Sequence, residues 1–206
     1  MEEKIVYFED SGVDNTDTTL SLALERSKNR GIKKIVLAST RGDTARILAA
    51  KLVGSGIKML VVPHQYGFGP EGRQRFPKEL VSDLERQGHS VYFGTMLFHT
   101  DGFFGNNTPT LMANLLRTFC QGMKVCVEIL FMAVNGGMVA SGENVVVVSG
   151  TGRGADTAVV AIAAPTTALG NFHITEIICK PLQTRQGPPP PPPGVPAGQP
   201  PVPPRP

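Results

Sequence analysis

The chain has 206 residues, of which 41% are hydrophobic and 18% charged, and a formal net charge of +3 at pH 7. This length and composition are typical of one globular domain with a sizeable core. The charge is small and no run of lysine and arginine occurs, which argues against nucleic-acid binding, and no apolar stretch reaches the roughly 18 residues that a membrane span needs.

The three cysteines, Cys120, Cys126 and Cys179, all lie in apolar segments. Their odd number and their spacing fit neither a disulfide framework nor a zinc site, so we expect reduced core residues and no bound metal. Segment 1–10, MEEKIVYFED, is acidic and leads into a strand pattern, unlike a secretory signal. The sequence therefore predicts a cytoplasmic protein without membrane association.

Strand and helix patterns alternate over residues 4–94. Short apolar runs predict strands at 4–10, 33–39, 58–63 and 89–94. Helical spacing of apolar residues predicts helices at 15–31, 43–56 and 77–88. Asn15 or Thr16 is expected to cap the first helix. The alternation is typical of right-handed βαβ units, and hence of a parallel sheet covered on both faces.

The pattern changes after residue 94. A loop rich in glycine and aromatic residues is predicted at 95–109, and helices follow at 110–122 and 123–137. Strands are predicted at 144–150, 156–164 and 174–181, with little helix between them. The last third of the domain is therefore expected to be mainly strand.

The composition changes again near the end of the sequence. Segment 187–206 contains twelve of the 18 prolines. Proline lacks an amide donor and fixes one backbone torsion, so we expect a folded domain at 1–186 and a disordered tail at 187–206. The spacing of Pro200, Pro203 and Arg205 fits ligands of proline-recognising domains, and an inert or solubilising tail is the alternative.

The first candidate phosphate loop lies between the strand at 33–39 and the helix at 43–56. The first turn of a helix leaves backbone N–H groups unpaired, and its dipole favours an anion. The candidate residues are Ser39, Thr40, Arg41, Gly42, Asp43 and Thr44. The alternative is a plain turn in which Asp43 or Thr44 caps the helix.

The second candidate loop is glycine-rich and follows the strand at 144–150. It is not a dinucleotide-binding loop, because the next residues, TAVVAIAA, favour a strand over the helix that such a motif requires. A strand–loop–strand can instead close over a phosphate with its backbone amides. The candidates are Gly150, Thr151, Gly152, Arg153, Gly154, Asp156 and Thr157. The alternative is a hairpin turn in which Asp156 pairs with Arg153.

Together the two loops resemble the C-terminal domain of pyruvate kinase, and more closely the stand-alone pyruvate kinase C-terminal-domain-like family. The resemblance covers residues 3–182 and is carried by stretches such as KKIVLASTRGDTA, GMKVCVEILFMAV, GTGRGADTAVV and EIICKP. It implies an α/β fold, a three-layer α/β/α sandwich around a mostly parallel sheet. It implies no pyruvate kinase activity, since this domain carries no chemistry in that enzyme and the catalytic barrel is absent here.

The resemblance also implies a ligand. The corresponding loops of regulated pyruvate kinases hold the phosphates of a sugar bisphosphate, and Ser39, Gly42 and Thr44 match the hydroxyl–glycine–hydroxyl pattern of the first loop. Asp43 departs from that pattern, because an acid would repel a sugar phosphate. Similarity to the stand-alone family implies FMN, with its phosphate on the first loop and its ring under the aromatic loop at 95–109.

Two further residues are candidates for the same cleft. Glu128 interrupts the apolar run VCVEILFM, either as the ion-pair partner of Lys124 on the same helical face or as a cleft-facing carboxylate with a raised pKa. His64 follows a strand at its carboxyl end, where ligands gather in α/β sheets, so we expect it to line the cleft with Tyr66 and Phe68. A surface-loop histidine is the alternative.

Aromatic residues in the loop at 95–109 allow two interpretations. Phe98, Phe103 and Phe104 lie beside Gly102 and Gly105, an arrangement that suits either a mobile lid that stacks on a ring or a packed core loop.

The sequence thus favours a domain that binds or senses a phosphorylated small molecule, FMN or a sugar phosphate. The alternative is a flavin-dependent or phosphate-handling enzyme that uses the same cleft. The oligomeric state stays open, a homo-oligomer included.

Overall fold

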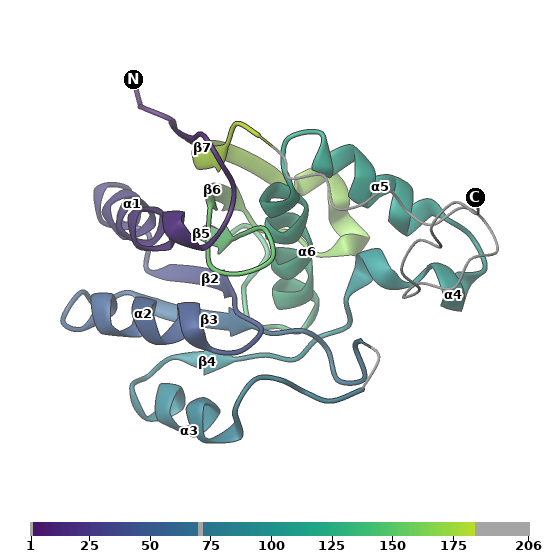
Figure 1. Cartoon of the computed structure of the whole chain (residues 1–206), viewed down its shortest axis with the longest axis horizontal. Coiled ribbons are helices and arrows are strands. Elements are labelled where there is room, and N and C mark those ends of the chain that lie inside the picture. Colours follow the sequence, from purple (N-terminus) through teal and green to yellow (C-terminus); the bar gives the residue numbers. More distant parts are fainter. Residues whose placement is uncertain (1, 70–71, 184–206) are drawn as a thin grey trace, which may run out of the picture.

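A single sheet forms the centre of the molecule (Figure 1). The computed structural model describes residues 2–69 and 72–183, so the predicted tail at 187–206 lies outside the described residues. Seven strands occur in the order β1-β7-β6-β5-β2-β3-β4. They are β1 (Val6–Phe8), β2 (Lys34–Ala38), β3 (Lys58–Val62), β4 (Ser90–Val91), β5 (Asn144–Ser149), β6 (Thr157–Ile162) and β7 (His173–Pro181). Strand β6 is antiparallel to β5 and to β7, whereas the other neighbours pair in parallel.

Helices cover both faces of this sheet, which confirms the predicted three-layer α/β/α architecture (Figure 1). One face carries α1 (Thr16–Asn29), α2 (Asp43–Leu52) and α3 (Lys78–Arg86). The other carries α6 (Gln121–Asn135), against which α5 (Thr108–Arg117) packs beside the short α4 (Asp101–Phe104). Three 3-10 segments complete the described elements: the single turns Val13–Asn15 and Leu97–His99, and the longer Thr166–Asn171, which is kinked at Ala168.

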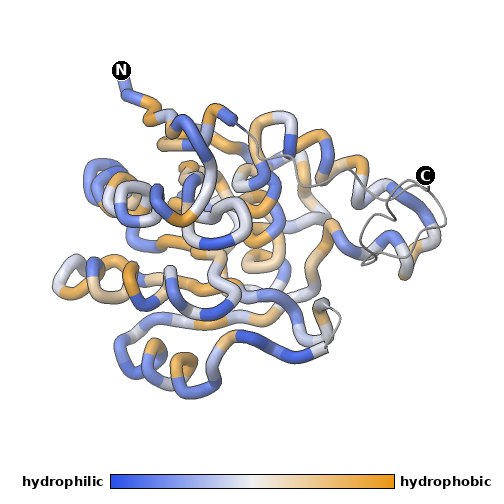
Figure 2. The backbone as a smooth tube through the Cα atoms, in the orientation of Figure 1, coloured by the Kyte–Doolittle hydropathy of each residue, from blue (hydrophilic) through white to orange (hydrophobic). Residues whose placement is uncertain are grey.

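Successive side chains of each central strand point to opposite faces of the sheet and pack into two separate cores. In β2, Ile35 and Leu37 pack with Leu20 and Leu48 on the α1–α2 face, while Val36 points to the α6 face. The α6 core also contains Cys120 and Cys126, and Cys179 lies in the other core, so all three cysteines are buried as predicted. Figure 2 shows hydrophobic residues concentrated in the central strands, with hydrophilic residues more frequent in α1 and in the loops. Burial on both faces explains the nearly unbroken apolar runs of β2, β3 and β5.

The boundaries differ from the sequence prediction mainly at the sheet edges. The predicted strands 4–10 and 89–94 shorten to β1 and β4, each of which pairs with a single neighbour and so has half the ladder hydrogen bonds of a central strand. The predicted loop at 95–109 contains one 3-10 turn and α4. Helix α5 begins earlier than predicted, at Thr108, because Pro109 is tolerated in a first helical turn.

Among the described residues, no helix is both long enough and apolar enough to cross a membrane.

Candidate functional site

A cavity of about 370 Å³ opens at the carboxyl ends of β2, β3 and β5. Strands β2 and β5 are direct parallel neighbours, with Leu37 opposite Val148, so the loops that follow them leave the sheet side by side. Both loops line the cavity, together with the segment after β3 and one side of α6. The pairing of β2 with β5 thus brings the two candidate loops to one site, although more than a hundred residues separate them.

The first loop presents hydroxyl groups to the cavity. Ser39 and Thr44 are largely buried residues that line it, and neither side-chain oxygen forms a hydrogen bond with another residue of the described ranges. Thr40, Arg41 and Asp43 also line the cavity. Because α2 begins at Asp43, its unpaired N–H groups and positive dipole end lie at the same place. A helix N-terminus beside hydroxyl groups that line a cavity is suited to an anion.

Gly42 shapes this loop without lining the cavity. It is the N-cap of α2 and has a φ of 87°, in the left-handed region that favours glycine. A Cβ at this position would lie 2.2 Å from Leu80 Cδ2 in α3. The alternative in which Asp43 or Thr44 caps α2 is wrong, because no side chain makes a capping hydrogen bond there.

The second loop divides into a face toward the cavity and a buried anchor. Gly150, Gly152, Arg153 and Gly154 line the cavity, whereas Thr151, Asp156 and Thr157 do not. The alternative interpretation is correct in its hairpin, since β5 and β6 pair in antiparallel fashion on either side of the loop. Its Arg153–Asp156 pair is wrong, because the Arg153 guanidinium lies 3.6 Å from Asp43 Oδ2.

Asp156 instead holds the second loop in shape. Its carboxylate is fully buried and accepts hydrogen bonds from Gly12 N at 3.0 Å, Thr151 N at 3.1 Å and Thr157 Oγ1 at 2.8 Å. The backbone at Gly154 also lies against α1, since a Cβ on Gly154 would be 2.2 Å from Thr16 Oγ1. Thr16 Oγ1 accepts a hydrogen bond from Ala155 N at 3.0 Å and so anchors the loop. The prediction that Asn15 or Thr16 caps α1 is wrong, because no side chain makes a capping hydrogen bond there.

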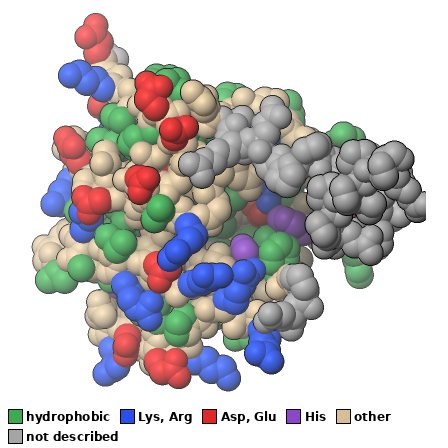
Figure 3. Space-filling view, viewed as in Figure 1, with side chains coloured by type: hydrophobic (Ala, Val, Ile, Leu, Met, Phe, Trp, Pro, Cys, Tyr) green, Lys and Arg blue, Asp and Glu red, His purple; other side chains and the backbone are tan. Residues whose placement is uncertain are grey.

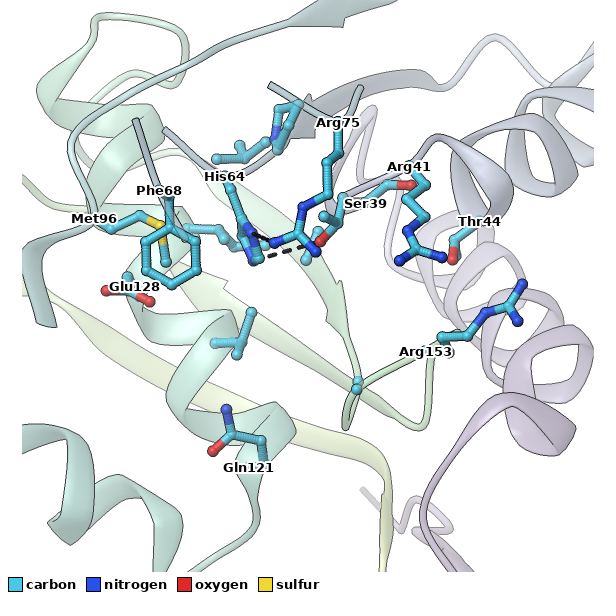
Figure 4. Close-up of a pocket in the computed structure, with 18 of the residues that line it drawn as sticks. Ser39, Arg41, Thr44, His64, Phe68, Arg75, Met96, Gln121, Glu128 and Arg153 are labelled. Atoms are coloured by element: carbon cyan, nitrogen blue, oxygen red, sulfur yellow. Dashed lines mark hydrogen bonds between the residues drawn. The ribbon is translucent and has the colours of Figure 1, made fainter. Parts of the chain in front are cut away.

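His64 lies in the segment after β3 and lines the cavity beside the first loop (Figure 4). Its Nε2 lies 3.4 Å from Thr40 Oγ1, and its Nδ1 lies 3.5 Å from the Arg75 guanidinium. Burial, followed by the positive charge of Arg75, lowers the pKa of His64. His64 is thus a half-buried loop residue that lines the cavity as expected, and its contact with a ligand stays a prediction. Arg75 escaped the sequence prediction, since nothing local distinguishes it from other arginines of the chain.

Aromatic rings form part of one wall. The Phe68 ring contacts His64 and His99 edge-on, with centroid distances of 4.6 Å and 5.2 Å. Met96 lies beside Phe68 (Figure 4), and Val62, Ile129 and Met132 add aliphatic surface. Tyr66 does not line the cavity but packs on Phe93.

The aromatic lid that 95–109 allowed is not formed. Phe103 and Phe104 are 85% and 63% exposed and contact each other outside the cavity. Phe98 is buried in a small cluster with Phe131 and Ala113, as the packed-loop interpretation required. Met96 and His99 are the residues of this segment that line the cavity.

Charged groups lie at the far end of the cavity, on α6. Glu128 Oε2 accepts a hydrogen bond from Lys124 Nζ at 2.5 Å, and its Oε1 accepts one from Phe98 N at 2.8 Å. His99 Nδ1 lies 3.2 Å from the same Oε1. Both interpretations of Glu128 are thus correct in part, because it pairs with Lys124 and also lines the cavity.

The expected rise in the pKa of Glu128 is wrong. Burial raises this pKa, but the hydrogen bonds from His99, Lys124 and Phe98 N, together with the charge of Lys124, outweigh burial and leave the pKa lowered. Glu128 is therefore an anion at neutral pH, although it is 2% exposed.

The opposite, outer end of the cavity is basic. Arg41, Arg75 and Arg153 line it, and Asp43 is the acid among them. Figure 3 shows Lys and Arg side chains gathered beside a hollow in which histidine side chains are visible. Arg41 and Arg153 beside the N-terminus of α2, with Arg75 next to His64, make the cavity attractive to a small anion.

Comparison with known proteins identifies a family that includes this fold and both loops. Residues 17–161 match the family described as pyruvate kinase, alpha/beta domain. A pyruvate kinase from Cryptosporidium parvum is similar with a TM-score of 0.39 and 14% identity, over 72% of this chain and 22% of that one. A pyruvate kinase of the same organism in complex with ADP gives a TM-score of 0.36 and 15% identity, over 71% of this chain and 23% of that one.

This chain therefore spans about a fifth of the length of the pyruvate kinases to which it is similar. The family match covers 17–161 of 206 residues, from α1 to the end of β6, and it includes both loops that line the cavity. The resemblance read from the loops is thus confirmed, and the chain belongs to the pyruvate kinase alpha/beta domain family.

Proposed function

We propose that this chain binds or senses a phosphorylated small molecule, either FMN or a sugar phosphate, with the phosphate held between the loops at 39–44 and 150–154. The observation that carries the proposal is that both loops line one cavity with Arg41 and Arg153 at its outer end. The hydroxyl groups of Ser39 and Thr44, which line the cavity, add donors that no other described residue engages. A phosphate group would accept hydrogen bonds from these donors and from the first turn of α2.

The cavity suits FMN in the kind of side chain that it offers. Donors and arginines lie at one end, while Phe68, Met96 and Met132 provide apolar surface beyond them. A flat ring packs well against aromatic and thioether groups. Bound FMN would supply electron-transfer chemistry. We propose binding and assign no pyruvate kinase activity, since the matched family is one domain of that enzyme. The buried thiols fit a reducing compartment, so the proposed location is the cytoplasm.

Calorimetric titration with FMN, fructose 1,6-bisphosphate and inorganic phosphate tests the proposal. Arg153→Ala should weaken binding of the best of these probes about tenfold, or about 1.5 kcal/mol, the lower end for a charged hydrogen bond, because Arg153 is exposed. Arg86→Ala is the matched control, since Arg86 is also exposed and paired with a carboxylate but lies on α3 outside the cavity.

Two results would count against the proposal. Absence of binding for all three probes would contradict it as a whole. Equal affinity of the wild type and Arg153→Ala would remove Arg153 from the site. A purified protein that is yellow with flavin absorbance would instead select FMN over a sugar phosphate.

A second candidate function, a phosphate-handling or flavin-dependent enzyme, rests on the charged cluster of Lys124, Glu128 and His99 in the same cavity. Ionisable groups that are buried beside a cleft are typical of catalytic sites. If Glu128→Gln and His64→Ala left every detected activity unchanged, this candidate would lose its residues.

A further inference from the structure

Lys124 is an unusual lysine, because its side chain is only 2% exposed and yet lines the cavity. Its Nζ donates one hydrogen bond, to Glu128 Oε2 at 2.5 Å, and lies 5.4 Å from the centroid of the Phe98 ring. An ammonium group has three N–H donors. Within residues 2–69 and 72–183 the other two find no hydrogen-bond acceptor, so the charged form of Lys124 is poorly satisfied.

This environment makes Lys124 easier to deprotonate than an ordinary lysine. Burial lowers the pKa of Lys124, the charge and hydrogen bond of Glu128 partly offset that effect, and the charge of Arg117 adds to it. A lysine with a lowered pKa loses its proton more readily at neutral pH, and the free amine is a nucleophile for carbonyl carbons. Nucleophilic lysines of this kind are held in desolvated pockets next to a group that moves their proton.

Glu128 is placed to move that proton. Its Oε2 is the acceptor for Lys124 Nζ, and its Oε1 is fixed by Phe98 N and His99 Nδ1. The carboxylate therefore has one oxygen committed to position and the other free to exchange a proton with the lysine. This division of roles is what a proton acceptor beside a nucleophile requires.

The same cavity contains the two phosphate-loop candidates at its other end. If the proposed function holds, on which this step rests, a ligand phosphate is fixed there and the remainder of the ligand extends toward α6. Sugar phosphates in their open-chain form carry an aldehyde or ketone, so the cavity would bring such a carbonyl group toward the α6 end.

We propose that Lys124 forms an imine with a phosphorylated aldehyde or ketone bound in this cavity. Glu128 takes one proton from Nζ, and the amine lone pair then attacks the carbonyl carbon to form a C–N bond. The carbonyl oxygen receives two protons, one from nitrogen and one returned by Glu128, and leaves as water. The product is a protonated imine, and atoms and charge balance without an oxidant or reductant.

Reductive trapping tests this proposal. The folded protein is incubated with glyceraldehyde 3-phosphate and cyanoborohydride, and modified lysines are located by peptide mass spectrometry. Lys34 is the internal control, because it is also ion-paired, with Glu143 at 3.0 Å, but lies outside the cavity. We expect Lys124 to be modified faster than Lys34, because its lowered pKa leaves more of its amine unprotonated.

Two further comparisons link the reaction to the cavity. Excess inorganic phosphate should slow modification of Lys124, and glyceraldehyde without its phosphate should react more slowly. Lys124→Arg should abolish the cavity adduct while keeping the positive charge beside Glu128, and Lys34→Arg should leave the adduct intact. Thermal unfolding of both variants verifies that they fold.

The outcomes separate this proposal from the function on which it rests. Non-covalent binding of glyceraldehyde 3-phosphate that is lost in Arg153→Ala, with Lys124 unmodified, would overturn the imine and support the phosphate site. Equally fast modification of Lys124 by glyceraldehyde, without protection by phosphate, would support the reactive lysine and contradict the phosphate site. Modification of surface lysines alone, with no binding of any phosphorylated probe, would overturn both.

Discussion

Asp43 and Arg153 face each other across the mouth of the cavity, each contributed by a different loop. Both side chains are more than half exposed, so the pair is worth little to stability, about 0.2–1 kcal/mol. The pair is more important for binding, because the Asp43 carboxylate would compete with a ligand phosphate for the Arg153 guanidinium. Asp43 also lies in the first turn of α2, where its negative charge opposes an incoming anion.

Asp43→Asn should therefore raise the affinity for inorganic phosphate or FMN by up to about fivefold, the equivalent of releasing one exposed ion pair. Titration calorimetry at low and high salt measures the change, and the gain should shrink as salt screens the charge. Asp83→Asn is the control, since Asp83 pairs with Arg86 on α3, away from the cavity. Weaker binding of Asp43→Asn would show that Asp43 helps to hold the ligand.

A histidine at the sheet edge gives a prediction for the dependence of stability on pH. His89 precedes β4, and its Nδ1 accepts a hydrogen bond from Met59 N at 3.2 Å, which requires a neutral imidazole acceptor. Burial, followed by the charge of Lys58, lowers the pKa of His89 below its ordinary value. The unfolded chain therefore takes up a proton first as the pH falls below about 6.5, and the folded state loses stability over that window.

Urea unfolding at a series of pH values checks this expectation. The free energy of unfolding should fall between about pH 7 and pH 5, and it should fall less steeply in His89→Gln, which does not titrate there. His64, whose pKa is also lowered, contributes in the same direction, so His64→Gln should flatten the curve as well. Identical slopes in the wild type and His89→Gln would contradict the role given to His89.

At the scale of elements, the sequence predicts best where a pattern is long and local. The runs that become β2, β3 and β5 are apolar throughout because both of their faces are buried, and α1 to α3 follow from helical spacing. Edge strands β1 and β4 were predicted too long, although Gln183 N still donates to Glu9 O and Tyr92 N to Val61 O just beyond their ends. Helix α4 was missed because four residues are too few for a periodic signal.

The site was harder to predict than the fold because its contacts are long-range. Residue types identified both loops, but the direction of Arg153, toward Asp43 and away from Asp156, depends on the β2–β5 pairing. The same holds for His99, which reaches Glu128 only because the segment after β4 folds back onto α6. No local pattern marks such contacts.

At the scale of the whole molecule, the sheet separates two cores, one on each of its faces. Leu48 on α2 belongs to one core and Leu130 on α6 to the other, and both are fully buried. Leu48→Ala and Leu130→Ala should each lower the free energy of unfolding by about 2–5 kcal/mol. Leu115→Ala, at an exposed position of α5, should change it by less than about 0.5 kcal/mol.

The double variant reports on how the layers communicate. Because the two leucines lie on opposite faces of the sheet, their effects should add to within about 0.5 kcal/mol in denaturant unfolding. A large deviation from additivity would show that strain passes through the sheet from one core to the other.

The reversed direction of β6 has a consequence for how this architecture can diversify. A parallel strand after β5 would require a crossover helix, whereas the antiparallel β6 returns at once, and the glycine-rich segment is simply the tip of a hairpin. Exposed hairpin tips accept insertions and deletions more readily than the elements that they connect. Because residues 154–156 are anchored to Gly12 and Thr16, changes of length are expected to be tolerated at Gly152 and Arg153, where they would alter the width of the cavity entrance opposite α2.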